Sequence, residues 1–93
     1  MDGDFQSIFS EKNVVSMLLF IYANKKVKES QLTEIVPNYY TSVKVVNILA
    51  DAGLVRSWSE KVGYTIRWYE ITDLGTQAAG HLYEANNLVK QQS

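Results

Sequence analysis

Residues 38–75 read NYYTSVKVVNILADAGLVRSWSEKVGYTIRWYEITDLG, and the pattern of apolar residues changes in the middle of this stretch. The first part predicts a helix that begins after Asn38, a good N-cap residue, and runs to about Ala52. Gly53 follows where a helix stop needs a left-handed backbone, which glycine adopts without a steric penalty. The expected apolar face of this helix consists of Val45, Ile48, Leu49 and Ala52.

The second part, Leu54–Thr72, is rich in β-branched and aromatic residues and predicts a hairpin that turns at Lys61-Val62-Gly63. This turn places Trp58 opposite Trp68, and a slip of one residue would exchange the two faces. One face is expected to carry Trp58, Tyr64, Ile66 and Trp68. The other is expected to carry Ser57, Ser59, Lys61, Thr65 and Arg67 toward the tip, with Val55, Tyr69 and Ile71 at the base.

A helix with apolar residues on most of its surface is expected before this stretch. Ser10 is its predicted N-cap, Glu11 lies in the first turn, where the helix dipole favours a negative charge, and Asn24 takes the left-handed end position. The apolar residues are Val14, Val15, Met17, Leu18, Leu19, Phe20, Ile21 and Tyr22. Such a helix belongs in the centre of a fold or under a partner.

Two further helices complete the predicted order. A short helix is expected over residues 29–36, and Pro37 ends it because its ring disfavours a helical residue before it. The last helix is expected over residues 73–90, with Thr72 or Asp73 as its cap. Four positions in this helix have the spacing of a short coiled-coil seam and form the expected dimer interface: Ala78, Leu82, Ala85 and Val89.

This order contains a helix-turn-helix followed by a two-stranded wing. Two separated motifs, TSVKVVNILADAGLV and YEITDLG, resemble the winged helix-turn-helix of small MarR- and PadR-like transcriptional regulators. The residues that carry the resemblance are Leu49, Gly53, Leu54, Val55, Tyr69, Ile71, Thr72 and Gly75. The resemblance implies an α+β, mainly helical fold with three helices, a β wing and a C-terminal helix, in a single domain over residues 1–93.

The chain departs from these regulators in two ways. Its predicted third helix carries one cation, Lys44, where the regulators usually carry several. It also lacks the extra helices with which larger members build ligand pockets, so a small-molecule effector is not expected.

Composition excludes several classes of function. The 93 residues include no cysteine and one histidine, His81, so we expect no metal, no cofactor and no cysteine or histidine catalysis. We find no carboxylate pair, glycine-rich phosphate loop or base–nucleophile pair at a useful spacing, and we do not expect an enzyme. The net charge of −1 means that any surface for nucleic acid must be local.

The sequence also bears on cellular location. The first residues, MDGD, are acidic where a signal peptide would be basic. The longest apolar stretch, Val14–Ala23, is too short to span a bilayer. A cytoplasmic protein with no membrane partner is therefore expected.

Double-stranded DNA is the partner that the resemblance implies. The third helix would meet the major groove through Tyr39, Tyr40, Thr41, Ser42, Lys44 and Asn47, and the wing would contact phosphates or the minor groove through Lys61 and Arg67. Each of these residues also has a structural interpretation. The tyrosines could pack on the first helix, Thr41 and Ser42 could simply begin their helix, and the wing cations could be solvated.

Trp58 and Trp68 allow two interpretations. Large rings on one face of a hairpin prefer to be covered. Phe5, Ile8 and Phe9 of the N-terminal segment could supply that cover, or the rings could bind a protein partner. Lys25, Lys26 and Lys28 are expected in a solvated loop, although in a winged-helix fold they could flank phosphates. Arg56 is expected either to pair with Glu70 or to contact DNA.

The leading hypothesis is a small dimeric regulator that binds specific DNA sequences. Its two third helices would enter successive major grooves, with half-sites about 34–36 Å apart. The alternative is a winged-helix module that binds a protein through its aromatic wing face and binds no DNA.

Overall fold

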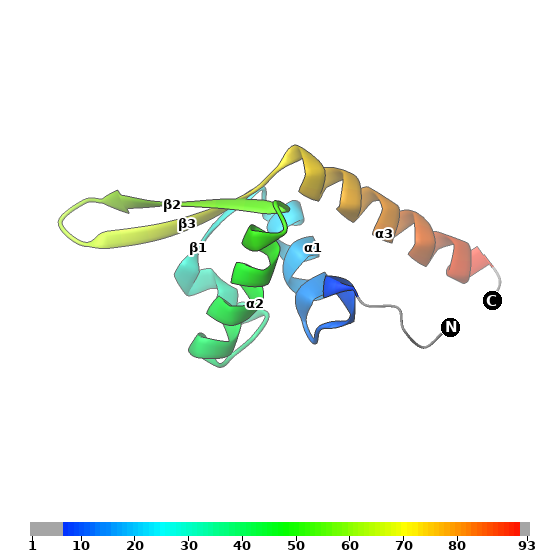
Figure 1. The fold of residues 1–93 in the computed structure, drawn as a ribbon, viewed down its shortest axis with the longest axis horizontal. Helices are drawn as coiled ribbons and strands as arrows, with labels where there is room; N and C mark the ends of the chain where they lie inside the picture. The colour runs from blue at the N-terminus through cyan, green and yellow to red at the C-terminus, as the bar shows by residue number, and fades with distance from the viewer. Residues whose placement is uncertain (1–6, 92–93) are drawn as a thin grey trace.

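The computed structural model describes residues 7–91 of the chain. In chain order its elements are η2 (Ile8–Ser10), α1 (Val14–Asn24), β1 (Lys26–Lys28), η3 (Glu29–Glu34), α2 (Tyr39–Asp51), β2 (Val55–Lys61), β3 (Thr65–Ile71) and α3 (Asp73–Gln91), where η marks a 3-10 helix. The strands form one antiparallel sheet in the order β1-β3-β2. In Figure 1 the β2–β3 hairpin, called the wing below, and helix α3 project from opposite ends of the helical body.

Helix α1 forms the centre of the core, as its apolar surface predicted. Val14, Met17, Leu18 and Ile21 have no exposed surface. They pack with apolar residues from the elements that follow: Val27, Leu32, Val36, Val45, Val46, Leu49, Leu54, Val55 and Tyr69. Because burial of apolar side chains is the main driving force of folding, this cluster fixes where α2 and the wing sit.

The predicted start of α1 at Ser10 is wrong. The Ser10 hydroxyl donates to the Ser7 carbonyl oxygen at 2.5 Å, so Ser10 closes the short turn η2 instead of capping a helix. The α-helix begins at Val14, after Asn13 in a left-handed conformation. Glu11 consequently lies before the helix and not in its first turn.

The end of α1 is at Asn24, as predicted, but the left-handed residue is the next one. Lys25 has φ 68°, and the Asn24 side-chain amide donates to the Phe20 carbonyl oxygen at 2.8 Å. The amide therefore satisfies a carbonyl of the last turn, and the change of chain direction falls on Lys25.

The segment after α1 is a strand, whereas a solvated loop was predicted. Strand β1 pairs with β3, with Lys26 opposite Glu70 and Lys28 opposite Trp68. Its pattern of exposed lysines around buried Val27 is that of a half-buried strand, but three residues are too few to show a period. The sheet therefore has a third strand that the sequence did not reveal.

The predicted helix-turn-helix is formed by η3 and α2. Residues 29–34 form a 3-10 helix, shorter and tighter than the helix predicted to reach Val36. Asn38 caps α2 as predicted, since its side chain accepts a hydrogen bond from the Thr41 backbone N–H at 2.9 Å. Gly53 has φ 80°, which confirms the left-handed stop.

The predicted register of the wing is confirmed. Trp58 lies opposite Trp68, Arg56 lies opposite Glu70, and the last pair before the turn is Lys61 with Thr65. Gly63 has φ 84° within the loop that joins the strands. The residues within the two strands therefore share faces as expected from the alternation, whereas Tyr64, predicted on the tryptophan face, lies in the loop.

The two motifs of the resemblance meet in space at the start of α3. The Thr72 hydroxyl donates to the carbonyl oxygens of Gly53 (2.7 Å) and Leu54 (2.9 Å) and accepts from the Gly75 N–H (3.0 Å), which makes Thr72 the cap of α3. A Cβ atom on Gly75 would lie 2.0 Å from the Leu54 carbonyl oxygen. This junction needs a glycine, and it joins the end of α2 to the start of α3.

Candidate nucleic-acid interface

Helix α2 presents one exposed stripe beside the wing. Tyr40, Lys44 and Asn47 recur at spacings of four and three and are exposed, as is Thr41. Tyr40 is the most prominent of them, with 82% of its surface exposed. The opposite side of α2 is buried against the core through Val45, Val46 and Leu49.

That buried side is rotated from the one predicted. Val46 is fully buried, Ile48 is only half-buried and Ala52 is exposed. Helix α2 packs against α1, η3 and β2 together, and the direction from which these elements cover it determines which stripe is buried. Sequence periodicity gives the width of such a face more reliably than its direction.

Ser42 does not belong to the exposed stripe. It has no exposed surface, and its hydroxyl donates to the Tyr39 carbonyl oxygen at 2.7 Å. The expectation that Ser42 contacts DNA is therefore wrong for this structure. A buried serine that bonds back to its own helix is a common way to satisfy a hydroxyl within a packed face.

Tyr39 and Tyr40 do not pack on α1, which was the alternative to a DNA contact for these residues. The Tyr39 hydroxyl donates to Glu29 Oε1 at 2.7 Å, which ties the start of α2 to η3. The two tyrosine rings pack edge to face, with centroids 5.4 Å apart. Tyr39 is half-exposed and held in place, whereas Tyr40 extends into solvent.

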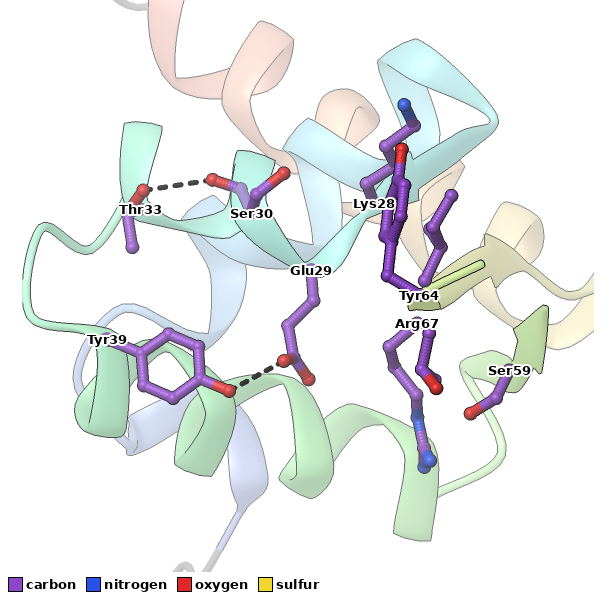
Figure 2. A pocket seen from close by; sticks show the side chains of 10 residues that line it. Lys28, Glu29, Ser30, Thr33, Tyr39, Ser59, Tyr64 and Arg67 are labelled. Carbon is purple, nitrogen blue, oxygen red and sulfur yellow. Dashed lines mark hydrogen bonds between the residues drawn. The ribbon is translucent and has the colours of Figure 1, made fainter. Parts of the chain in front are cut away.

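A groove of about 770 Å³ runs between η3 and one face of the wing (Figure 2). This face, called the inner face below, carries Ser59, Thr65 and Arg67. Its polar lining includes Lys28, Ser30, Thr33, Tyr39, Ser59 and Arg67. Arg67 comes from β3, and its guanidinium donates to Ser57 Oγ at 3.2 Å. A wing cation, Arg67, and the first residue of α2, Tyr39, therefore line the same groove.

Glu29 is the carboxylate at this groove, and no local sequence pattern marks it as a site residue. Its two oxygens accept hydrogen bonds from Tyr39 and from Tyr69, the latter at 3.0 Å. Burial, and then the hydrogen bond to Glu29, raise the pKa of Tyr69 to about 12. The same carboxylate raises the pKa of Tyr39. Both phenols therefore stay protonated and continue to donate over the physiological pH range.

The outer face of the sheet carries the tryptophans, and the lysines of β1 cover them. Trp58 and Trp68 stack with ring centroids 6.4 Å apart, and the Lys26 ammonium lies 4.7 Å from the centroid of Trp68. Trp68 also donates to Glu60 at 3.0 Å, and Arg56 pairs with Glu70, as one of its two predicted roles required. These contacts stiffen the wing.

The described part of the N-terminal segment, from residue 7 onward, does not cover the two tryptophans. Ile8 packs against the main core, and Phe9 lies in an apolar groove with α3. Phe5 lies outside the described residues. Since the tryptophans are half-buried beneath cations of the same sheet, no observation specifically favours a protein partner on this face.

Helix α3 divides the predicted dimer residues into two groups. Ala78 and Leu82 are half-buried and pack against the core, whereas Ala85 and Val89 are exposed. The exposed end of the helix also carries Leu88. An apolar groove of about 370 Å³ lies between Phe9 and the first turns of α3.

Comparison with known proteins bears on the fold. No protein-family profile and no curated protein matches the chain. A solved structure described as the transcriptional regulator homologue protein from Pyrococcus horikoshii OT3 is similar, with a TM-score of 0.80 over 91% of this chain and 86% of that one, at 19% identity.

The chain has a winged-helix fold. In this fold α2 is the second helix of the helix-turn-helix, and the β2–β3 hairpin is the wing. Within residues 7–91, no helix is long and apolar enough to cross a membrane. The same residues contain no group of three or more histidine, aspartate or glutamate side chains placed to hold a metal ion.

Proposed function

We propose that this winged-helix protein is a transcriptional regulator that binds specific sequences in double-stranded DNA. The observation that carries the proposal is the exposed stripe of α2, which stands free of the core beside a wing that bears cations. The description of the similar Pyrococcus protein as a transcriptional regulator homologue agrees with it. The narrower resemblance to MarR- and PadR-like regulators stays a prediction.

In this proposal some exposed side chains contact bases and others contact phosphates. Asn47 reaches base edges in the major groove, where an amide can distinguish base pairs, and Lys44 reaches a phosphate or a base edge beside it. Tyr40 and Thr41 at the start of α2 donate to phosphates, whereas the hydroxyl of Tyr39, the third residue expected there, donates to Glu29 instead. Lys61 at the wing tip and Arg67 on its inner face contact the flanking backbone.

We propose that the protein acts as a homodimer joined through α3. Val89 is 69% exposed and Leu88 is 63% exposed, on a helix end that extends beyond the core. The wing and this helix end project in opposite directions (Figure 1), so pairing through α3 leaves both copies of α2 free. Such a dimer would bind a pseudo-palindrome with half-sites about 34–36 Å apart.

A titration of duplex DNA tests the proposal. Duplexes are first selected by wild-type protein from a random pool, and binding is then measured for Lys44→Ala and for the matched control Lys25→Ala. Both variants lose one positive charge, but Lys25 lies over the Tyr22 ring at the end of α1. We expect Lys44→Ala alone to weaken binding, by about 1–3 kcal/mol if Lys44 reads a base.

Two results would contradict the proposal. One is a folded wild-type protein that binds no duplex at low salt. The other is an equal loss of affinity in the two lysine variants, because binding would then depend on total charge and not on the exposed stripe of α2.

A further inference from the structure

Glu29 links the two parts of the proposed interface. It is the first residue of η3, and its carboxylate accepts from the Tyr39 hydroxyl of α2 at 2.7 Å and from the Tyr69 hydroxyl of β3 at 3.0 Å. Figure 2 shows the bond to Tyr39, with Glu29 extended toward α2 at the groove. Three elements that are distant in sequence therefore meet at one side chain.

We propose that Glu29 is a positioning residue, which holds the start of α2 at a set place relative to the wing and thereby determines how well the protein discriminates between DNA sequences. This inference rests on the proposed function. It adds a residue that need not touch DNA, and it assigns a role to the carboxylate at the groove.

The Tyr69 end of this link is rigid. Tyr69 is 1% exposed, and its backbone lies in the central strand between Val27 and Ser57. A buried hydroxyl needs a hydrogen-bond partner, and Glu29 is that partner. One oxygen of the carboxylate is consequently fixed to the core of the fold.

The Tyr39 end of the link reaches the surface. Tyr39 is the first residue of α2 and is 49% exposed, and its ring packs on the ring of Tyr40, which belongs to the exposed stripe. A half-exposed tyrosine without a bond at its hydroxyl would sample several rotamers. The bond to Glu29 selects one, and this restricts Tyr40 as well.

The role calls for a carboxylate. Both of its oxygens accept, whereas a glutamine at this position would accept with one oxygen and donate with its nitrogen. Within residues 7–91 no ion pair is formed by Glu29, so its charge is stabilised by the two phenols. A negative charge at the groove that Arg67 lines opposes the approach of phosphates, so Glu29 does not serve overall affinity.

The test compares binding of two duplexes, one selected by wild-type protein from a random pool and one with the same bases in scrambled order. The ratio of the two Kd values measures discrimination. We expect Glu29→Gln and Tyr39→Phe each to reduce this ratio about three- to tenfold, which corresponds to the loss of one hydrogen bond. Glu29→Gln leaves one accepting oxygen for two phenols, and the buried Tyr69 hydroxyl has the greater need of it. All three variants therefore lack the bond at Tyr39, and the double variant should lose no more than either single variant.

Glu34→Gln is the matched control. Glu34 is an exposed carboxylate on the same 3-10 helix, and its replacement removes the same charge without breaking the link. We expect this variant to keep the wild-type ratio. If Glu29→Gln fails to fold, Tyr39→Phe still decides the question, because it breaks the same bond and leaves the buried Tyr69 pair intact.

Three results would overturn the positioning role alone: a wild-type ratio in Glu29→Gln and Tyr39→Phe, additive losses in the double variant, or an equal loss in Glu34→Gln. A wild-type protein that selects no duplex would instead remove the proposed function, and the positioning role with it. The two failures are therefore distinguishable.

Discussion

Gly75 shows how one position without a side chain sets the approach of two segments. A Cβ atom there would lie 2.0 Å from the Leu54 carbonyl oxygen and 2.6 Å from Ile71 Cδ1. We expect Gly75→Ala to destabilise the fold by about 1–3 kcal/mol or more, because backbone must move to admit the methyl group. Urea denaturation measures the change.

Gly80 in the same helix is the control for this prediction. Nothing lies within 4 Å of a Cβ atom at Gly80, so Gly80→Ala should stabilise the protein by about 0.5–1 kcal/mol through higher helix propensity. Equal denaturation midpoints for the two variants would show that Leu54 and α3 do not approach this closely.

The free energy of unfolding is expected to depend on pH in the alkaline range because of Tyr69. Its pKa is about 12 in the folded protein and 10.0 for an unperturbed tyrosine, so the folded state holds this proton more tightly than the unfolded state. The stabilisation is complete below pH 10 and is lost as the pH rises from 10 to 12. We expect urea midpoints to fall over this range in wild type, and to fall less in Tyr69→Phe. Parallel curves for the two proteins would contradict the prediction.

The cations of α2 and the wing are the residues whose contribution to binding can be counted. Lys44, Lys61 and Arg67 provide about three phosphate contacts per protomer and about six per dimer, so log affinity against log salt should have a slope near −5. Lys61→Ala should flatten this slope by about 1 to 2 in the dimer and weaken all sequences alike.

The other lysines near the wing should leave that slope unchanged. The ammonium groups of Lys26 and Lys28 lie over Trp68 on the outer face of the sheet, away from the exposed stripe of α2. Lys26→Ala therefore serves as the control in the same titration. A slope that responds equally to Lys26→Ala and Lys61→Ala would place the DNA elsewhere on the molecule.

At the scale of the whole molecule, α3 is expected to control assembly. Val89→Asp places a charge on the exposed end of the seam, and we expect it to convert the dimer to a monomer of 10.6 kDa in sedimentation equilibrium. Asn87→Asp adds the same charge on the other side of the helix and should leave the dimer intact. A wild-type protein that sediments as a monomer at micromolar concentration would contradict the proposed dimer.

Local rules account for the parts of this molecule that were predicted from sequence. Asn38 and Gly53 mark the ends of α2 because capping and left-handed conformations depend on single residues. The Trp58–Trp68 register follows from the position of the turn and from strict alternation along a strand. The central place of α1 follows from an apolar surface that only a core can cover.

Tertiary contacts decided the remainder. Strand β1 forms because the edge of β3 is available beside it, which three residues around Val27 do not reveal. Ser42 is buried because α1, η3 and β2 together determine which side of α2 faces inward. Glu29 meets Tyr69 across 40 positions of sequence, and a hydrogen bond over that separation depends on how the elements pack, which neither residue's neighbours in sequence can specify.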